Sequence, residues 1–316
     1  MKIAILEAKT VSRGDVSFDE IYKLGEVREF PLTPVDKIVE NVGDAEIVLC
    51  NKTPFTADII RACPNLKYIG LCATGYNNVD IKTCNELGIT VCNVPAYSTA
   101  AVAQLVFSFI LHFASRTSAY NKFVQSGGWI KSETFSDFLY PIQELAGKTI
   151  GIIGYGSIGR KVAHIAQAFN MNVIVNTRTA KQDGSVKFVG LKELFSEADV
   201  ITAHCPLTDE TMGLINKETL SYCKPSCVII NTSRGPVVNE QDLADALNSG
   251  KIAGAALDVL CQEPMSADCP LIGAKNCIIT PHIAWAPLET RERLVKIAAE
   301  NIRAFIEGNP INTVNK

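Results

Sequence analysis

Apolar and polar positions alternate along the first 96 residues in a pattern that predicts strands and helices in turn. Short apolar runs predict strands at 3–6, 46–49, 68–71 and 89–92. Helical patterns between and after them predict helices at 18–24, 34–42, 56–62 and 79–87. Thr56 is a predicted N-cap and Gly88 a predicted helix stop. Because strands that alternate with helices build parallel sheets, this part is expected to form one α/β layer structure.

The same alternation resumes at Lys148 and continues through the rest of the chain. Predicted strands lie at 149–153, 173–175, 200–203, 228–231, 255–259 and 278–279. Predicted helices lie at 160–169, 191–196, 217–222 and 241–248. Asn239 fits an N-cap, with Asp242 at the third helical position. Six strands with connecting helices make a complete doubly wound domain. A last helix is expected after Pro287, stopped by Gly308 and Pro310.

The segment 99–116, between the two alternating halves, predicts one long helix that is apolar nearly all round. Such a helix is buried on several sides, either between domains or in a subunit interface. We favour an interface between two copies of the chain, because the segment is more apolar than one domain is expected to cover. Residues 118–145 are expected to form a connecting stretch.

Composition and charge exclude several classes of protein. The 316 residues are 47% hydrophobic and 20% charged, with a net charge of −3 and no block of Lys and Arg. This argues against nucleic acid or an anionic membrane as the main partner. The apolar runs are too short for a signal peptide or a spanning helix. The 11 cysteines lack paired spacing, which is typical of buried free thiols in a reducing cytoplasm and not of a metal site.

A glycine-rich hexapeptide, Gly154-Tyr155-Gly156-Ser157-Ile158-Gly159, follows one predicted strand and opens a predicted helix. In this context the first glycine makes a tight turn, the second lets the backbone approach a pyrophosphate, and the third lets the helix pack on the strand. The pyrophosphate would then bind the unpaired N–H groups of the first helical turn. The motif therefore predicts a dinucleotide site.

The end of the second strand of such a domain selects the cofactor, because an acidic residue there binds the ribose hydroxyls of NAD. This chain has Asn176, Thr177 and Arg178 at that place and no carboxylate. Thr177 and Arg178, with Lys181 close by, could hold a 2′-phosphate instead. We favour NADP on this ground. The alternative is an NAD site that uses Asn176 for the ribose and leaves Arg178 in solvent.

Three further residues follow predicted strands, where the ligand crevice of these sheets lies. Arg234 has the planar fork that grips a carboxylate. Glu263 precedes Pro264, and His282 follows the last predicted strand. A carboxylate beside a histidine stabilises its charged form, so that the imidazolium can donate a proton near neutral pH. Together the three residues predict that Arg234 binds an anion, that Glu263 stabilises the charged form of His282, and that His282 donates a proton.

These motifs, taken jointly, resemble the family of D-isomer-specific 2-hydroxyacid dehydrogenases over nearly the whole chain. The matching segments are 74–80, 154–159, 204–208, 231–235, 256–259, 263–264 and 281–282. Segments 73–80, 144–149 and 281–285 are most similar to the glycerate dehydrogenase/hydroxypyruvate reductase branch. The resemblance implies a cytoplasmic oxidoreductase that moves a hydride between NAD(P)H and the C2 carbonyl of a small 2-oxo acid.

The resemblance also implies residue roles. Arg234 would bind the substrate carboxylate or carbonyl, and His282 would be the proton donor, paired with Glu263. Asp258 would hold the nicotinamide carboxamide, and His204 and Pro206 would flank the cofactor. The expected cofactor site comprises Gly154, Gly156, Ser157, Ile158, Gly159, Asn176, Thr177, Arg178, His204, Cys205, Pro206, Thr232, Ser233, Asp258 and Ala284. The expected substrate site comprises Thr74, Gly75, Arg234, His282 and Trp285. Trp285 either walls the pocket or packs between domains.

The implied fold is a Rossmann doubly wound cofactor domain, residues 98–285, inserted into a flavodoxin-like substrate domain, residues 1–97 and 286–316. Helix 99–116 would then lie in a homodimer interface. Gln104 stands where many members have Glu, and nothing in the sequence explains it. Two alternatives stay open: the same chemistry on glyoxylate, pyruvate or phosphohydroxypyruvate, or a non-catalytic NAD(H)-sensing protein of the same fold.

Overall fold

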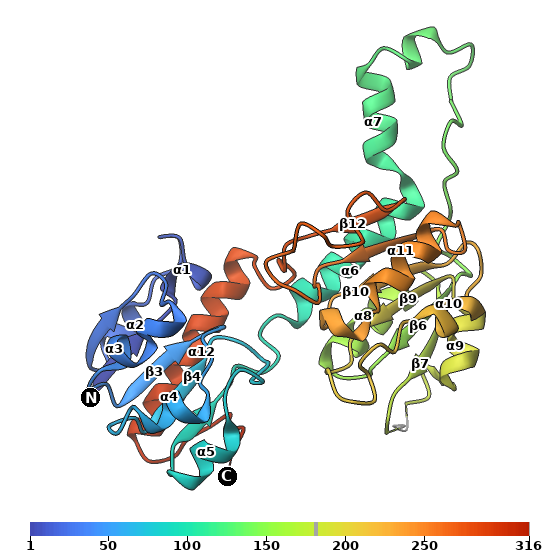
Figure 1. Cartoon of the computed structure of the whole chain (residues 1–316). Coiled ribbons are helices and arrows are strands. Elements are labelled where there is room, and N and C mark those ends of the chain that lie inside the picture. Colours follow the sequence, from blue (N-terminus) through green and yellow to red (C-terminus); the bar gives the residue numbers. More distant parts are fainter. Residues whose placement is uncertain (180–182, 316) are drawn as a thin grey trace. The chain divides into compact units, whose positions relative to one another are not determined.

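The computed structural model describes residues 1–179 and 183–315. Lys181, a candidate for phosphate binding, lies outside the described residues. The chain divides into two compact units (Figure 1): Met1–Ser98 with Trp285–Lys316, called here the first unit, and Thr99–Ala284, the second unit. The boundaries expected from the sequence lie one residue away from these, so that Ser98 and Trp285 belong to the first unit.

The first unit contains one parallel five-stranded sheet in the order β2-β1-β3-β4-β5. The strands are β1 (Lys2–Ile5), β2 (Glu26–Glu29), β3 (Ile47–Cys50), β4 (Tyr68–Leu71) and β5 (Thr90–Cys92). This is the flavodoxin-like strand order. Strand β2 was not predicted, because this edge strand is largely exposed and has no apolar run.

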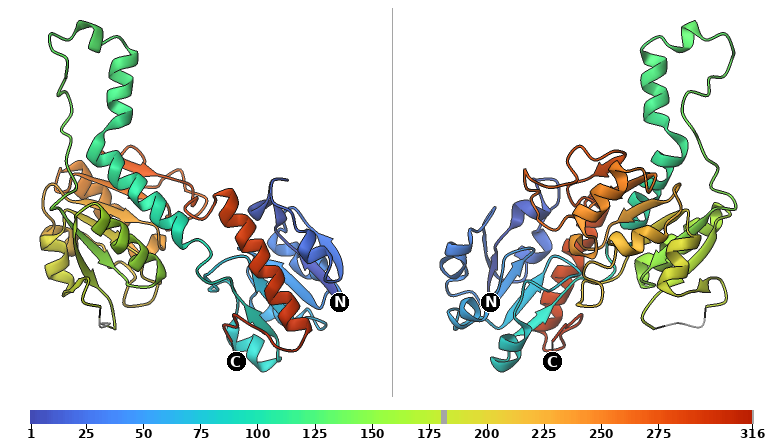
Figure 2. Two further views of the ribbon diagram at one scale, coloured as in Figure 1. Left: turned by 180° about the vertical axis from the view of Figure 1, so that it is seen from behind. Right: turned by 45° about the vertical axis from the view of Figure 1, so that its right-hand side comes forward.

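Helices cover both faces of this sheet. Helices α1 (Ala8–Val11), α2 (Asp19–Tyr22) and α12 (Leu288–Ile306) share one apolar cluster with one face. The long helix α12 runs along β4 and its neighbours (Figure 2). On the other face lie η1 (Val35–Lys37), α3 (Ile38–Val42), α4 (Ala57–Arg61) and α5 (Ile81–Glu86). Thr56 caps α4 as predicted, and Gly88 has the positive φ of a helix stop after α5.

The second unit contains a parallel seven-stranded sheet in the order β12-β11-β10-β9-β6-β7-β8. Its strands are β6 (Thr149–Ile153), β7 (Asn172–Asn176), β8 (Lys187–Phe188), β9 (Val200–Ala203), β10 (Val228–Asn231), β11 (Gly254–Leu257) and β12 (Cys277–Ile279). Counted from β6, this is the Rossmann order 3-2-1-4-5-6 with β12 added at the edge. The two-residue strand β8 was missed by the sequence analysis because it is short and partly exposed.

Two helical layers enclose the second sheet. Helices α6 (Thr99–Ser115) and α8 (Ser157–Ala168) share an apolar cluster with one face. Helices α9 (Leu191–Glu197), α10 (Lys217–Tyr222) and α11 (Glu240–Asn248) share a cluster with the other face, and Asn239 caps α11 as predicted. Phe107, Ile110 and Phe113 of α6 are buried in the cluster of the second unit. The second unit therefore covers part of the apolar surface of α6, and the expected subunit interface at this helix stays a prediction.

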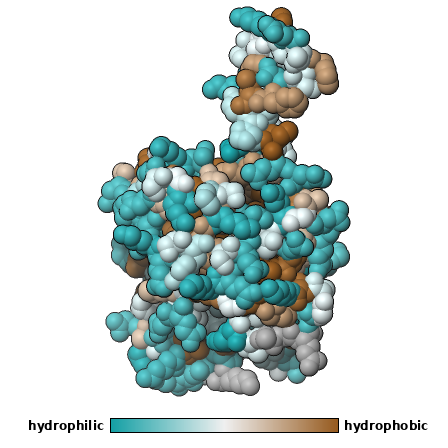
Figure 3. Space-filling view, turned by 90° about the vertical axis from the view of Figure 1, so that its right-hand side faces the viewer, coloured by the Kyte–Doolittle hydropathy of each residue, from teal (hydrophilic) through white to brown (hydrophobic). Residues whose placement is uncertain are grey.

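An arm formed by residues 117–142 projects from the second unit (Figures 1 and 2); Gln143 returns to the unit, where its N–H donates to the Ala114 carbonyl at 2.9 Å. Residues 118–145 connect the two halves as expected, but they also contain regular structure: helix α7 (Thr117–Gln125) begins just before them and η2 (Trp129–Lys131) lies within them. Arg116 has a left-handed backbone, φ 53°, at the bend between α6 and α7. The space-filling view shows apolar side chains along the arm (Figure 3).

No single helix in the described ranges is long and apolar enough to cross a membrane, although α6 and α7, bent by 54°, pass that test together by length and composition. Within the same residues no group of three or more His, Cys, Asp or Glu side chains is arranged to hold a metal ion.

Candidate functional site

The three glycines of the hexapeptide have different spatial constraints. Gly154 turns the chain after β6 with φ 92°, and a Cβ there would lie 2.7 Å from the backbone of His204. A Cβ on Gly159 would lie 2.2 Å from the carbonyl oxygen of Gly154, so this glycine permits the close approach of α8. A Cβ on Gly156 would meet no atom within 4 Å. Gly156 therefore borders open space, as expected for a glycine that a pyrophosphate approaches.

The N-terminus of α8 is suited to hold an anion. The helix is 12 residues long, begins at Ser157, and has no side chain that caps its first turn. The N–H groups of Ser157, Ile158 and Gly159 precede the first intrahelical donor, Arg160, whose N–H donates to the Gly156 carbonyl at 3.0 Å. Unpaired N–H groups and the helix dipole together attract phosphate oxygens. With the space above Gly156, the loop fits the pyrophosphate of a nicotinamide dinucleotide.

The end of β7 presents polar and basic groups and no carboxylate. Asn176 donates from Nδ2 to the carbonyl oxygen of Val189 at 3.0 Å, which leaves its Oδ1 as the polar atom for a ligand. Thr177 is half-buried and Arg178 is exposed. In the loop that follows, Asp183 accepts a hydrogen bond from the Tyr155 hydroxyl at 2.7 Å. Tyr155 thereby ties the glycine loop to the loop between β7 and β8.

His204 lies beside the glycine loop at the end of β9. Its backbone N–H donates to the Ile153 carbonyl at 2.7 Å, and its Nε2 lies 2.9 Å from the hydroxyl of Thr202. Burial lowers the pKa of His204 to about 3. The ring is therefore neutral at neutral pH, which suits a wall residue and not a proton donor. Cys205, which follows it, is buried, and Pro206 is exposed.

Arg234 lies in a loop whose residues hydrogen-bond to one another. Asn231, the last residue of β10, accepts from the Ser233 N–H at 3.0 Å and from its hydroxyl at 2.8 Å, and it donates to the Arg234 carbonyl at 2.8 Å. The guanidinium donates from Nη1 to the Ser233 carbonyl at 2.7 Å. Thr232 and Ser233 are buried and Arg234 is half-buried. The remaining N–H groups of the Arg234 fork can take a bidentate anion.

His282 and Glu263 form a hydrogen-bonded pair. Nδ1 of His282 lies 2.8 Å from Oε2 of Glu263, and the two side chains are 27% and 32% exposed. The other Glu263 oxygen, Oε1, accepts from the Leu260 N–H at 3.2 Å. A carboxylate on Nδ1 orients the ring and leaves Nε2 to exchange a proton with a ligand. The pair is therefore suited to general acid–base chemistry.

Asp258 is 1% exposed and lies directly under the His282 loop. Its carboxylate accepts from the N–H groups of Ile283 and Ala284, at 2.9 and 2.8 Å, and from the Thr280 hydroxyl at 2.5 Å. Burial raises the pKa of the Asp258 carboxyl, and these hydrogen bonds act in the opposite direction. Most of the acceptor capacity of Asp258 is thus used inside the protein.

The candidate substrate residues of the first unit lie after β4 and before α12. The Thr74 hydroxyl donates to the Val94 carbonyl at 2.9 Å, and the Thr74 carbonyl accepts from Asn93 at 2.7 Å. Among the described residues, no acceptor is bonded to the N–H groups of Thr74 and Gly75. Trp285 packs on the core of the first unit, with its ring 6.5 Å from that of Tyr97.

Several supporting residues were missed by the sequence analysis: Tyr155, Asp183, Asn231 and Thr280. Their side chains bond positions that are remote in sequence or depend on loop conformation, so no spacing pattern reveals them; Asn231 alone has a signal, as the last residue of a strand. Gln104 is exposed on α6, and nothing in the structure explains it.

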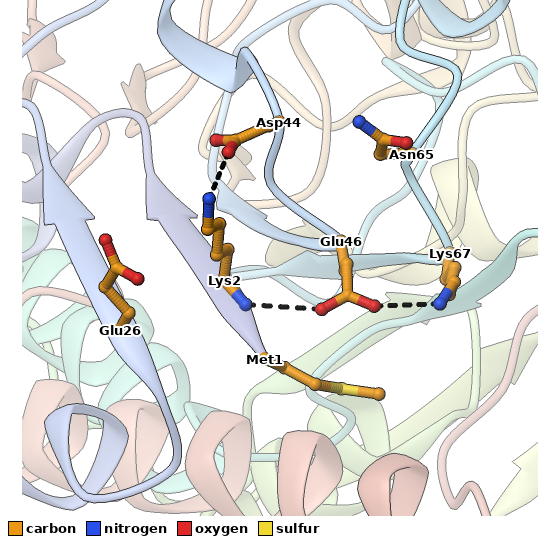
Figure 4. A pocket seen from close by; sticks show the side chains of 7 residues that line it. All are labelled: Met1, Lys2, Glu26, Asp44, Glu46, Asn65 and Lys67. Carbon is orange, nitrogen blue, oxygen red and sulfur yellow. Dashed lines mark hydrogen bonds and ion pairs between the residues drawn. The ribbon is translucent and has the colours of Figure 1, made fainter.

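A separate pocket of about 540 Å³ lies at the amino ends of the strands of the first sheet (Figure 4). Its charged groups are largely paired with one another: Lys2 with Asp44, and Glu46 with Lys67 at 2.8 Å and with the Lys2 N–H at 3.4 Å. Ligands of open α/β sheets bind at the carboxyl ends of the strands. We therefore do not assign the reaction to this pocket.

The chain is similar to known proteins over most or all of its length. Residues 107–284 match the family model described as "D-isomer specific 2-hydroxyacid dehydrogenase, NAD binding domain". A hydroxypyruvate reductase of Blautia hydrogenotrophica is 44% identical over 100% of both chains. A glycerate dehydrogenase of Methylorubrum extorquens is 37% identical over 99% of this chain and 98% of its own.

Solved structures share the whole architecture. The TT0316 protein from Thermus thermophilus superposes with a TM-score of 0.90 at 33% identity, over 99% of this chain and 100% of that one. An acyclic imino acid reductase in complex with NADPH and D-Arg has a TM-score of 0.88 at 30% identity, over 99% and 100%. D-lactate dehydrogenase from Aquifex aeolicus, complexed with NAD and lactic acid, has a TM-score of 0.86 at 29% identity, over 98% and 96%. The chain belongs to the family of D-isomer-specific 2-hydroxyacid dehydrogenases, which are nicotinamide-dependent oxidoreductases.

Proposed function

We propose that this protein is a hydroxypyruvate reductase, which interconverts hydroxypyruvate and D-glycerate with NADPH as the preferred reductant. The observation that carries the proposal is the 2.8 Å pair of His282 and Glu263 beside the Arg234 loop. The relatives named hydroxypyruvate reductase and glycerate dehydrogenase support the choice of substrate, since they align with nearly the whole chain.

The glycine loop and the N-terminus of α8 would hold a reduced nicotinamide dinucleotide, which would supply the hydride for C2 of the 2-oxo acid. Arg234 binds the substrate carboxylate or carbonyl through the N–H groups that its own loop leaves available. His282 gives the proton from Nε2 to the C2 oxygen, while Glu263 stabilises the imidazolium from the other side of the ring. One hydride and one proton added to the carbonyl yield the 2-hydroxy acid. The protein contributes orientation and charge stabilisation at the oxygen.

We further propose that the N–H groups of Thr74 and Gly75 bind the substrate carboxylate. Supporting this, neither group donates to an acceptor among the described residues. Two adjacent backbone N–H groups can both donate to a carboxylate oxygen, as the N–H groups of an oxyanion hole donate to an oxyanion. Trp285 is a candidate for the same substrate site, although its ring also packs against Tyr97.

The preference for NADPH rests on the end of β7. No carboxylate directly follows that strand, and Arg178 is exposed there with Thr177 beside it. A guanidinium and a hydroxyl suit a 2′-phosphate, whereas an acidic residue would repel it. A solved relative of the same architecture is in complex with NADPH, and another is complexed with NAD.

We propose that two copies associate through the arm, as a cytoplasmic homodimer. Ile130, Phe135 and Phe138 are 88%, 91% and 83% exposed on the arm, and Trp129 and Ile142 are 51% and 55% exposed. Large apolar side chains gathered at such exposure mark an interaction surface. A second copy presents the same surface, so that a two-fold arrangement buries both arms at once. Helix α6, from which the arm continues, would adjoin that interface.

The test of the proposed activity is a steady-state panel of hydroxypyruvate, glyoxylate, pyruvate and phosphohydroxypyruvate, each with NADPH and with NADH. We expect the highest kcat/KM for hydroxypyruvate with NADPH. A higher kcat/KM for another 2-oxo acid would reassign the substrate. No oxidation of either nicotinamide with any of the four acids would favour the non-catalytic, dinucleotide-sensing alternative.

A further inference from the structure

The backbone of His282 has a conformation that its surroundings must maintain. Its φ is +54°, in the left-handed region that residues other than glycine rarely adopt. Such a conformation costs free energy and persists only where neighbouring contacts determine it. The contacts that determine it here come chiefly from one residue.

Asp258 accepts four hydrogen bonds from the five-residue segment 280–284. Its carbonyl oxygen accepts from the His282 N–H at 2.9 Å. Its Oδ1 accepts from the Thr280 hydroxyl at 2.5 Å and from the Ile283 N–H at 2.9 Å, and its Oδ2 accepts from the Ala284 N–H at 2.8 Å. The segment is therefore folded around Asp258, with donors before, at and after His282.

Thr280 completes this arrangement from the other end of the segment. Its carbonyl oxygen also accepts from the His282 N–H, at 2.9 Å, while its hydroxyl bonds the carboxylate. Asp258 is 1% exposed, and a buried carboxylate must be hydrogen-bonded to remain stable. The Thr280 hydroxyl is the one side-chain donor on that carboxylate among the described residues; the other two are backbone N–H groups.

We propose that Asp258 and Thr280 are positioning residues, which hold His282 in its left-handed conformation so that Nδ1 faces Glu263. Asp258 then acts on the reaction through the 280–284 backbone. The inference rests on the proposed function for its kinetic consequence, but the geometry of the histidine exists whether or not the protein turns over substrate.

The first test uses Thr280→Val, which removes the hydroxyl at nearly constant volume, and Thr280→Ser, which keeps it. We expect Thr280→Val to lower kcat by roughly 10-fold, because small displacements of a catalytic group are costly, with the KM for NADPH unchanged. Thr280→Ser should restore most of kcat. The pH–rate profile of Thr280→Val should move in the same direction as that of Glu263→Gln, since both variants weaken the pairing of His282.

A second measurement does not depend on activity. The chain has 4 histidines, so the titration of the His282 ring can be followed by NMR and assigned with His282→Gln. We expect the titration curve in Thr280→Val to approach that in Glu263→Gln, and the curve in Thr280→Ser to match the wild type. Thr219→Val is the matched control, because the Thr219 hydroxyl bonds the Leu214 carbonyl at 3.0 Å in the N-cap of α10, away from this loop.

Asp258→Asn separates the two roles of that side chain. An amide has one oxygen and cannot accept from both the Ile283 N–H and the Ala284 N–H, so the 280–284 segment and the titration of His282 should both change in this variant. Loss of NADPH binding with an unchanged His282 titration would overturn the proposal and leave Asp258 as a cofactor ligand. Identical His282 titration in the wild type, Thr280→Val and Thr280→Ser would also overturn it. Absence of turnover in the wild type refutes the proposed function alone.

Discussion

Gly235 lies against the backbone of Leu260 with no room for a side chain: a Cβ on Gly235 would lie 1.9 Å from the carbonyl carbon of Leu260. This contact brings together the segment that follows β10 and the segment that follows β11. One carries Arg234, and the other carries Glu263, whose Oε1 accepts from the Leu260 N–H. The glycine therefore sets the spacing between the anion-binding loop and the carboxylate that pairs with His282.

Gly235→Ala is expected to displace these two loops, because backbone cannot move aside as a flexible side chain can. We expect a loss of stability of about 2 kcal/mol or more and a fall in kcat/KM for hydroxypyruvate. Thermal unfolding and steady-state kinetics measure the two effects. Gly184→Ala is the control, because a Cβ there meets no atom within 4 Å and φ is not positive. Equal stability and activity in both variants would contradict the role of the contact.

His282→Ala should lower kcat by on the order of 10²–10⁴ while NADPH still binds, because the glycine loop and α8 are untouched. Glu263→Gln should have a smaller effect, since the ring remains but loses the charge that stabilises its protonated form. Cofactor binding is measured by the fluorescence of reduced nicotinamide. Turnover near the wild-type value in His282→Ala would remove His282 from the mechanism.

Arg178→Ala should raise the KM for NADPH roughly tenfold or more and leave the KM for NADH nearly unchanged, because only NADPH carries the 2′-phosphate. Arg61→Ala is the matched control: it removes the same charge from a surface pair with Glu86 in the first unit. If the wild type prefers NADH and keeps that preference in Arg178→Ala, the end of β7 does not select NADP.

The arm is tested by the double substitution Phe135→Ser with Phe138→Ser. Both rings are more than four-fifths exposed, so the change should not disturb the fold of one chain. We expect sedimentation velocity to show a dimer for the wild type and a shift toward monomer for the variant. Leu32→Ser with Val35→Ser is the control, at 54% and 64% exposure in the first unit. A wild-type monomer would refute the arm as a self-association surface.

His204 predicts a pH dependence of stability. Burial lowers its folded-state pKa to about 3 from its ordinary value of 6.5. Between these two pH values the unfolded chain binds a proton that the folded chain does not, so the free energy of unfolding falls as the pH falls below 6.5. The slope is at most about 1.4 kcal/mol per pH unit. Thermal unfolding of the second unit at about pH 7 and about pH 5 should therefore show a smaller loss in His204→Gln than in the wild type. Equal losses would contradict a neutral, half-buried His204 in the folded protein.

Much of the fold was predictable because its signals are local. The apolar runs located ten of the strands, and the caps at Thr56 and Asn239 lie where the structure has them. The edge strands β2 and β8 were not predicted, since they are short, exposed and have no apolar run. Helix α7 was not predicted either, and none of its residues is buried. The expected homodimer interface at 99–116 stays a prediction; the structure adds that α8 and the second sheet already cover part of that helix.

The sequence by itself determined the order of the buried strands and most of the helices, the glycine turn at Gly154, and the residue types Arg234, Glu263 and His282 after predicted strands. These follow from backbone sterics and hydrophobic periodicity, which depend on neighbours in the chain. Only the tertiary structure decided that Asp258 and Thr280 shape the His282 loop, that Gly235 fits against Leu260, and that the arm is left uncovered. Those features depend on which distant segments come within hydrogen-bonding or van der Waals distance, and no local pattern encodes that distance.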